Sequence, residues 1–232
     1  QIRQRTDEIV ADPDSAPKGV GVGREGDTAA DRSSEEAANR AVRGTSFMVR
    51  FDPLFQRLAL QPKLLEIVRG LLGPKVRVFR DQMLLKPPGG QAKPLHQDQS
   101  YFRVLPEGEL VTAWIALDEV TTENGCMSVV KASHKLGRIE HGRKGEASGV
   151  DQARLEQALK HLERVEWHLD VGDAVYFHCN LLHASGSNTS DRPRTIIHCS
   201  YNAVDNSPFL PSQEAHAYRP LAVVPDNAIV EG

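Results

Sequence analysis

The chain has 232 residues, 40% of them hydrophobic, and a formal net charge of −3 at pH 7. This length and apolar content suffice for one sizeable core, so we expect a single domain over residues 1–232. The charge balance argues against nucleic acid and anionic lipid as partners, and no apolar run approaches the roughly 20 residues that cross a bilayer. Small molecules are the expected partners, while the oligomeric state is not readable.

The cysteines of the chain predict its redox environment. Cys126, Cys179 and Cys199 form no C-x-x-C pair, and their odd number argues against a disulfide framework. The first residues lack the charged-then-apolar pattern of a signal peptide, although the sequence begins at Gln1 and a removed leader would not be seen. Both features predict a cytoplasmic protein.

Residues 1–75 are predicted to be mainly helical. A serine cap precedes the helix-forming run EEAANRAV, and PKLLEIVRGLLG places its leucines and valine on one helical stripe between a proline and a glycine. The segment 12–35 is rich in Gly, Asp, Ser and Pro and has almost no large apolar residues. We therefore expect a flexible loop or lid over most of that segment.

Residues 76–205 change to short β-favouring runs separated by turn residues: VRVF, MLL, SYFRV, VTAWIAL, MSVV, RVEWHL, AVYF and TIIHCSY. The predicted fold class is mainly β with flanking α-helices, as a sandwich or barrel. An insertion at about 137–163 interrupts these runs with a polar loop and an amphipathic helix that could cap the barrel. Residues 206–232 read as an irregular tail.

The segment PLHQDQSYF carries the first candidate for chemistry. His96 and Asp98 stand two residues apart in an expected strand, whose alternation puts both side chains on one face. An imidazole and a carboxylate need one more ligand to complete the 2-His-1-carboxylate set of non-haem iron sites, and His183 is the best candidate. An isolated H-x-D pair often arises by chance, so the surrounding residues decide.

The residues after His183 supply that context. Ser185 and Arg194 follow at the second and eleventh positions, and the expected strand TIIHCSY could lie beside the one that bears His183. A guanidinium there could grip a carboxylate in bidentate geometry. Arg192 could compete for this role, but we interpret it as a surface charge; His198 is either a buried polar residue or a pocket wall.

Taken together, HQDQSYF, VTAWIALDEVTTENGCM, SHKLG, GDAVYFH and HASGSNTSDRPR resemble the phytanoyl-CoA dioxygenase family of 2-oxoglutarate oxygenases, over roughly residues 76–201. The resemblance implies a double-stranded β-helix, a cupin-like jelly roll that binds Fe(II) within its open end. It also implies 2-oxoglutarate as cosubstrate and O2 as oxidant.

The resemblance further implies roles for individual residues. His96, Asp98 and His183 would bind the iron, and Arg194 would pair with the C5 carboxylate of 2-oxoglutarate. Contacts with cosubstrate or substrate are implied for a further set of residues: Ser185, Lys86, Gln97, Trp114 and Tyr101.

The implied reaction is hydroxylation of a C–H bond of a small organic substrate, with release of succinate and CO2. Asp98 favours hydroxylation over halogenation, because related halogenases have a small residue at that position. The alternative is a cupin-like metal-binding barrel with a non-redox or ligand-sensing role, against which Arg194 argues. The basic loop from Arg138 to Lys144 gives a mild preference for an anionic substrate, although a solvated loop is the better explanation of these charges.

Overall fold

The computed structural model describes residues 1–24, 42–102, 104–105, 108–139, 141–144, 147–150, 152–204, 207–208 and 222–223. Its larger sheet contains β1 (Gly21–Arg24), β2 (Val42–Ser46), β3 (Val76–Lys86), β6 (Leu110–Ala116), β11 (Ala174–His178), β13 (Arg194–Ala203) and β15 (Ala222–Val223). The order is β1-β2-β3-β13-β6-β11, with β15 also paired to β3, and every pair is antiparallel.

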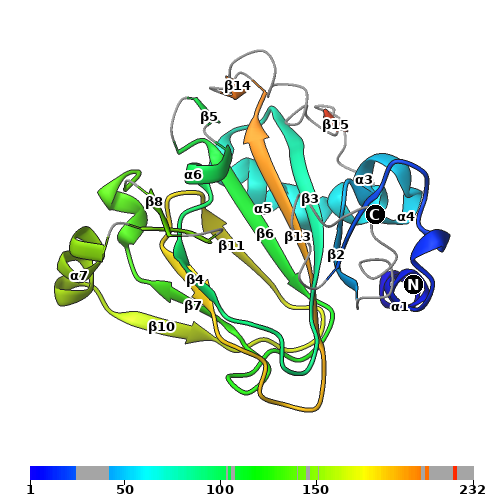
Figure 1. The fold of residues 1–232 in the computed structure, drawn as a ribbon. Helices are drawn as coiled ribbons and strands as arrows, with labels where there is room; N and C mark the ends of the chain where they lie inside the picture. Colours follow the sequence, from blue (N-terminus) through cyan, green and yellow to red (C-terminus); the bar gives the residue numbers. More distant parts are fainter. Residues whose placement is uncertain are drawn as a thin grey trace.

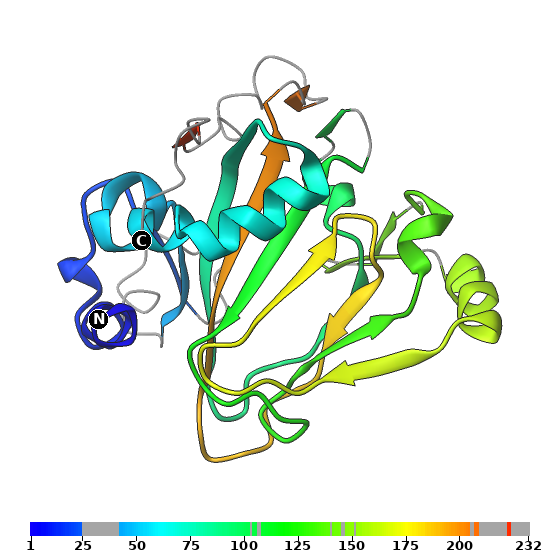
Figure 2. The same ribbon diagram turned by 180° about the vertical axis from the view of Figure 1, so that it is seen from behind.

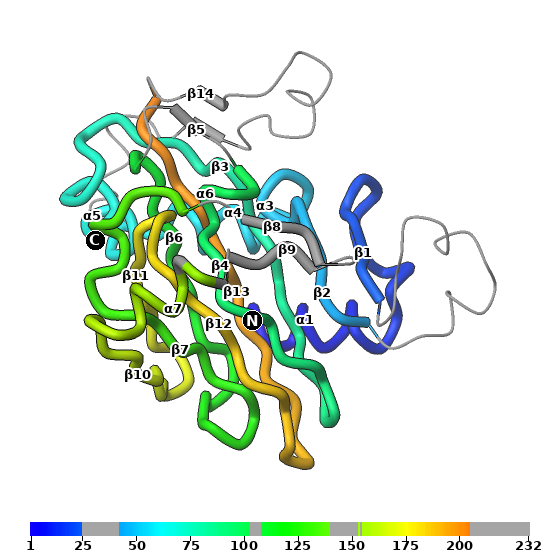
Figure 3. Tube along the Cα trace, turned by 60° about the vertical axis from the view of Figure 1, so that its left-hand side comes forward, coloured from blue at the N-terminus to red at the C-terminus, as the bar shows by residue number. Residues whose placement is uncertain are grey.

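A smaller antiparallel sheet faces this one (Figures 1 and 3). It contains β4 (Lys93–His96), β7 (Met127–Val130), β10 (Arg164–Trp167) and β12 (His183–Ser185), in the order β10-β7-β12-β4. Two further pairs are short: β5 (Val104–Leu105) with β14 (Ser207–Pro208), and β8 (His141–Lys144) with β9 (Ala147–Val150). This arrangement agrees with the predicted β-rich fold.

Helices from the N-terminal third pack on the outer face of the larger sheet. They are α1 (Ile2–Ala11), the 3-10 helix η1 (Pro13–Ser15), α3 (Met48–Phe51), α4 (Pro53–Ala59) and α5 (Pro62–Leu72). In Figure 2, α5 crosses the strands of this sheet, and it buries the predicted stripe of Leu64, Leu65 and Val68. Three other helices lie elsewhere: α6 (Gln99–Phe102), η2 (Ser133–Leu136) and α7 (Gln152–His161).

The larger sheet is buried on both faces, and the alternation of β6 shows how. Ala113 and Ile115 join the core beneath the helices, whereas Trp114 and Ala116 point between the two sheets. Because both faces are covered, the strand reads in the sequence as an unbroken apolar run. Tyr201 fastens the helical layer further, since its hydroxyl donates to the carbonyl of Ala59 at 2.7 Å.

The structure differs from the predicted elements at several places. Part of the expected flexible segment forms η1 and β1, because the glycine-rich strand pairs through its backbone with β2 rather than by burying side chains. The first three residues of the SYFRV run do not form a strand, since residues 99–102 form α6, and β5 begins only at Val104. The polar insertion contains the β8–β9 hairpin before the predicted helix, α7, and the tail contributes β14 and β15. The predicted helix after residue 33 lies outside the described residues.

The described residues also bear on the predictions about membrane spans and cysteines. None of the described helices combines the length and apolar character needed to cross a membrane. Cys126, Cys179 and Cys199 are all buried and unpaired, as the absence of a C-x-x-C pattern predicted.

Asp81 on β3 makes the stability of the fold depend on pH. Burial raises the pKa of this carboxyl from 3.8 to about 6, although the backbone N–H of Val49 donates to it at 3.2 Å. Because the folded-state pKa lies above the unfolded one, the stabilisation by the protonated acid is full below about pH 4 and is lost as the pH rises through about 6. Between those limits we expect the unfolding free energy of the wild type to fall by about 3 kcal/mol relative to Asp81→Asn. Urea denaturation of both proteins measures the difference, and parallel pH profiles would contradict it.

Candidate metal and cosubstrate site

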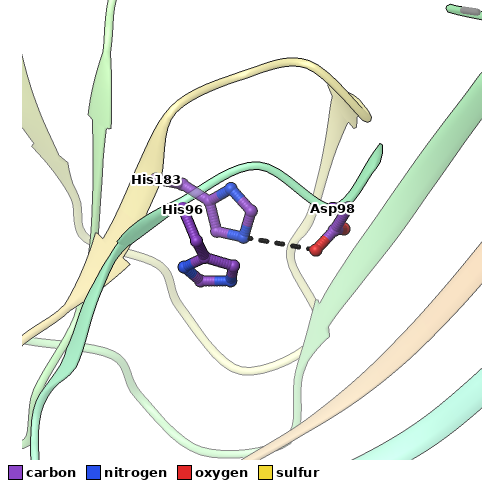
Figure 4. A group of neighbouring side chains, drawn as sticks. All are labelled: His96, Asp98 and His183. Atoms are coloured by element: carbon purple, nitrogen blue, oxygen red, sulfur yellow. Dashed lines mark ion pairs between the residues drawn. The ribbon is translucent and has the colours of Figure 1, made fainter. Parts of the chain in front are cut away.

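A cavity of about 430 Å³ opens between the two sheets. Its floor brings together three predicted ligands, His96 and His183 from the paired strands β4 and β12 and Asp98 from the turn after β4 (Figure 4). One potential ligand atom from each residue lies within 4.8 Å of the other two, and all three side chains are buried. Residues far apart in the sequence thus form one compact donor group.

The two imidazoles are oriented by backbone carbonyls. Nδ1 of His96 lies 2.8 Å from the carbonyl oxygen of Pro94, and Nδ1 of His183 lies 2.9 Å from that of Leu181. A carbonyl oxygen can only accept, so each Nδ1 carries the proton and each Nε2 keeps its lone pair. This outer hydrogen bond is the one that metal-binding histidines use to fix ring and tautomer.

The charges of the three groups also suit a cation. Burial, with a smaller effect of His183, lowers the pKa of His96 to about 3, and burial lowers the pKa of His183 as well, so both rings are neutral at pH 7. Burial alone would raise the pKa of Asp98, but the neighbouring His183 and His198 outweigh it and hold that pKa below its ordinary value. The group therefore offers two neutral nitrogens and one carboxylate.

The geometry that unites His96 and Asp98 is not the predicted one. β4 ends at His96, and Asp98 lies in the turn that follows. The backbone carbonyl of Asp98 accepts hydrogen bonds from the N–H groups of Tyr101 and Phe102, where α6 begins. The chain bends at Gln97, so strand alternation is not what puts the two side chains together. The bend allows the carboxylate to approach the rings from a different direction, with Asp98 Oδ1 at 3.7 Å from His183 Nε2.

Gln97 was predicted to contact cosubstrate or substrate, and the structure places its side chain outside the cavity. Its side chain is fully buried and does not line the cavity. Nε2 donates to the carbonyls of Gly137 at 2.9 Å and Asn180 at 2.7 Å, and Oε1 accepts from the N–H of Ile139 at 2.7 Å. The bend therefore turns Gln97 into the protein, where it joins two loops behind the site.

Gln97→Leu should consequently lower stability rather than cosubstrate affinity. Three backbone groups lose their partner, and a buried unsatisfied group costs about 1–3 kcal/mol, so we expect a loss of roughly 3 kcal/mol or more. Urea denaturation measures the loss, and titration of the folded variant with 2-oxoglutarate should give the wild-type affinity. If Gln97→Leu kept normal stability but bound 2-oxoglutarate more weakly, Gln97 would instead have a role in cosubstrate binding.

Three residues predicted to bind the cosubstrate lie together on the cavity wall. Arg194 pairs in register with Lys86 across β13 and β3, and Lys86 Nζ donates to Ser185 Oγ at 2.9 Å and to the carbonyl of Gly186. The Arg194 guanidinium lies over the ring of Trp114, with 5.2 Å between the Cζ atom and the ring centroid. All four side chains line the cavity, as does Tyr101.

Arg194 is a buried cation without a matching anion. It is 5% exposed, its Nε has no hydrogen-bond partner, and it forms no ion pair within the described part of the chain. Burial lowers the pKa of this guanidinium to about 10, which still leaves it charged at pH 7. An unpaired buried charge is costly, so the site fits a carboxylate ligand.

From the sequence, the strand that carries Arg194 could lie beside the strand that carries His183. The structure instead separates the two strands. β13 belongs to the larger sheet and β12 to the smaller one, so the two residues face each other across the cavity. Arg192, two residues earlier, is exposed and lies 3.5 Å from Glu119, as expected of a surface charge. Arg138 is exposed and does not line the cavity; the side chains of 141–144 lie outside the described residues.

Several lining residues were not singled out from the sequence. On β3, Arg80, Gln82 and Leu84 precede Lys86 at alternate positions, and all four face the cavity. His198, left open between pocket wall and buried polar residue, lines the cavity with Nε2 at 3.7 Å from Asp98 Oδ2. The period of two in β3 was a usable signal, because one lining residue on a regular strand implies its second neighbours.

Comparisons with known proteins assign this site to a family. A family model described as phytanoyl-CoA dioxygenase (PhyH) matches residues 1–196. The chain belongs to the phytanoyl-CoA dioxygenase family. It is 30% identical over 155 residues to the peroxisomal phytanoyl-CoA dioxygenase of Homo sapiens, which covers 64% of this chain and 46% of that protein. It is also 30% identical over 210 residues to the L-proline trans-4-hydroxylase of Streptomyces griseoviridis, covering 82% and 75%.

Solved structures agree with the assignment. EctD from S. alaskensis with bound Fe gives a TM-score of 0.74 at 22% identity, covering 90% of this chain and 70% of that one. The non-heme alpha-ketoglutarate-dependent carbocyclase SnoK gives 0.65 at 28%, covering 77% and 71%. These matches confirm the predicted double-stranded β-helix fold. The chain spans about half the length of the phytanoyl-CoA dioxygenases it matches.

The family's cofactors, Fe(II) and 2-oxoglutarate, are those predicted from the sequence, and the residues present fit both. Two Nε2 lone pairs and one carboxylate form the donor set that non-haem Fe(II) prefers. The unpaired Arg194 guanidinium beside Ser185 suits the dicarboxylate.

Proposed function

We propose that the protein is an Fe(II)- and 2-oxoglutarate-dependent dioxygenase that hydroxylates a C–H bond of a small organic substrate, releasing succinate and CO2. The observation that carries this proposal is the convergence of His96, Asp98 and His183 on the floor of a cavity whose wall holds the unpaired Arg194. Membership of the family supports the same class of reaction.

The three donor residues would bind the iron and leave room for its other ligands. His96, Asp98 and His183 would hold iron from one side, because their side chains leave the cavity side open to other ligands. When bound, Fe(II), 2-oxoglutarate and O2 supply an oxidative decarboxylation coupled to transfer of one oxygen atom to the substrate. The backbone carbonyls behind the imidazoles keep each ring in the tautomer that can bind a metal.

The wall residues would bind and orient the cosubstrate. Arg194 offers its guanidinium to the C5 carboxylate, as its lack of an anionic partner supports. Lys86 Nζ can only donate, so Ser185 Oγ accepts from it and keeps its own hydrogen for the same carboxylate. Trp114 packs beneath the guanidinium and reduces access of water to it.

The charge of the cavity supports an anionic substrate. Lys93 lines the cavity in addition to the two cations given to the cosubstrate, and its Nζ lies 5.4 Å from the ring centroid of Tyr101. Asp98 is the one carboxylate among the described lining residues, and its charge would be used by the iron. A screen of candidate substrates, each tested as the carboxylic acid and as the matching amide, measures this preference through succinate release. We expect the acids to be turned over faster than their amides, and equal turnover of both would contradict the preference.

The three buried, unpaired thiols support the cytoplasmic location predicted from the sequence, because a reducing compartment keeps such groups reduced.

The first test is anaerobic titration of the metal-free protein with Fe(II) and then with 2-oxoglutarate. Chelation of iron by the keto and carboxylate oxygens should produce a weak visible charge-transfer band, and succinate, which lacks the keto group, should produce none. Bound iron without the band would overturn the proposal and favour a cupin-like barrel with a non-redox or ligand-sensing role.

A further inference from the structure

A second group of metal-binding side chains lies outside the cavity. Cys126, Glu166 and His168 bring one potential ligand atom each to within 4.8 Å of the other two. Cys126 is 3% exposed, whereas Glu166 and His168 are open to solvent. None of the three lines the cavity that holds the first group, so the two are separate.

The register of β7 and β10 produces this convergence. Trp167 pairs with Met127 and Glu166 with Ser128, so the chain positions next to this ladder, Cys126 and His168, meet at its end. Met127 lines the cavity, whereas Cys126, just before the strand, does not, although it packs in the same buried cluster. The three ligand atoms therefore meet at the end of the β7–β10 ladder, outside the cavity.

The loop that carries Cys126 is fixed without any ligand. The backbone N–H of Cys126 donates to the carbonyl of Thr121 at 2.9 Å, and a β-bridge joins Val120 to Leu169. Asn124 braces the turn, because its side chain accepts from Thr121 N at 2.9 Å and donates to Glu119 O at 2.7 Å. A site held in this way loses little conformational entropy when an ion binds.

A fourth donor points to the same place. Thr122 Oγ1 lies 2.7 Å from Glu166 Oε2 and 3.0 Å from His168 Nε2, and these last two atoms are 3.4 Å apart. A hydroxyl that bridges a surface carboxylate and imidazole would explain these three groups alone. The Cys126 thiol belongs to the same group, because it makes side-chain hydrogen bonds with Glu166 and Thr122. Sulfur is the ligand that separates zinc-like ions from harder ones, and a metal ion would replace these hydrogen bonds.

We propose that Cys126, Glu166 and His168 form a second metal site, suited to Zn²⁺ or another ion that accepts sulfur, nitrogen and oxygen together. Thr122 or a water completes the coordination. Binding replaces the thiol proton, which passes to solvent, and gives a metal–thiolate bond. The ion fastens the loop of Thr121–Cys126 to β10.

This fastening reaches the wall of the first cavity. Gly125, in the same loop, has φ +82°, and a Cβ there would come within 2.6 Å of the carbonyl of Gly186 and 2.9 Å of the Lys86 side chain. Gly186 directly follows Ser185, and Lys86, at the end of β3, donates to both residues. The site is therefore structural and supports the cosubstrate wall from behind.

Co(II) is the probe that separates the two sites, because a thiolate ligand gives an intense sulfur-to-cobalt charge-transfer band in the near ultraviolet and the His-Asp-His group has no sulfur. We expect anaerobic titration of the full chain to show this band with one equivalent bound at the second site. Asp98→Ala should keep the band, so failure of the proposed oxygenase site and failure of this one are distinguishable.

Variants identify the ligands. Cys126→Ser and His168→Gln should lose the band, while the matched thiol variant Cys179→Ser should keep it. His168 is exposed, so His168→Gln decides the matter even if Cys126→Ser does not fold. Zn²⁺ should raise the melting temperature of Asp98→Ala but not of the double variant Asp98→Ala/His168→Gln. A wild-type protein without the band at saturating Co(II), or a band that survives in His168→Gln, would overturn the proposal.

Discussion

Replacing His183 by alanine is expected to remove the bound iron and to abolish 2-oxoglutarate turnover. The side chain supplies one of three donor atoms, and the carbonyl of Leu181 holds its Nδ1 so that Nε2 faces the other two ligands. Loss of an outer-shell partner alone typically costs 10–100-fold in metal affinity, so we expect the loss of a ligand to exceed about 100-fold. Anaerobic Fe(II) titration and succinate release measure the two effects.

The matched control is His178→Ala, which changes a histidine five residues earlier in the chain. His178 accepts a hydrogen bond from the N–H of Asn180 at 3.0 Å, and its ring lies 5.5 Å from that of His134, away from the cavity. This variant should keep its iron and its turnover once its folding has been verified. Iron affinity close to the wild type in His183→Ala would remove the basis of the assigned donor set.

Most strands were predictable because burial on both faces leaves an unmistakable sequence pattern. β6 and β13 are buried along nearly their whole length. β6 is an uninterrupted run of apolar and β-branched residues, and β13 opens with the β-branched run Thr195, Ile196 and Ile197 before polar residues alternate with apolar ones. The exception at Gln99–Phe102 has a physical cause. Tyr101 and Phe102 favour strands, but their N–H groups bond to the carbonyl of Asp98, and this local turn outweighs propensity.

The site was predictable where the signal is local and unpredictable where it depends on packing. Residues two positions apart can reach one ion from a strand or from a turn, so the spacing identified His96 and Asp98 as a pair. The assumed continuous strand was nevertheless wrong, because β4 ends at His96. The direction of Gln97 depends on loops around Gly137 and Asn180 that are distant in sequence. The place of His198 was unpredictable for the same reason. Whether its side of β13 faces the cavity or the helices depends on how the two sheets pack, which the local sequence does not show.

Arg194→Met should weaken 2-oxoglutarate binding strongly while leaving the protein at least as stable without cosubstrate. Truncating a buried charged partner of a carboxylate costs about 2–5 kcal/mol, which corresponds to roughly 30-fold or more in the dissociation constant. Methionine keeps an apolar stem over Trp114, and it removes a guanidinium that is 5% exposed and forms no ion pair among the described residues. We therefore expect bound 2-oxoglutarate to supply the anionic partner that the described residues do not offer to Arg194.

Two readouts together test this role, and Arg192→Met is the matched control. Arg192 is two residues away but exposed, with Glu119 at 3.5 Å, so its variant should bind 2-oxoglutarate as the wild type does. Titration of the visible charge-transfer band gives the affinity, and thermal unfolding of the metal-free proteins gives the stability. If Arg194→Met lost stability and kept its affinity, the guanidinium would be a structural cation, and the carboxylate would have to bind Lys86 and Ser185 instead.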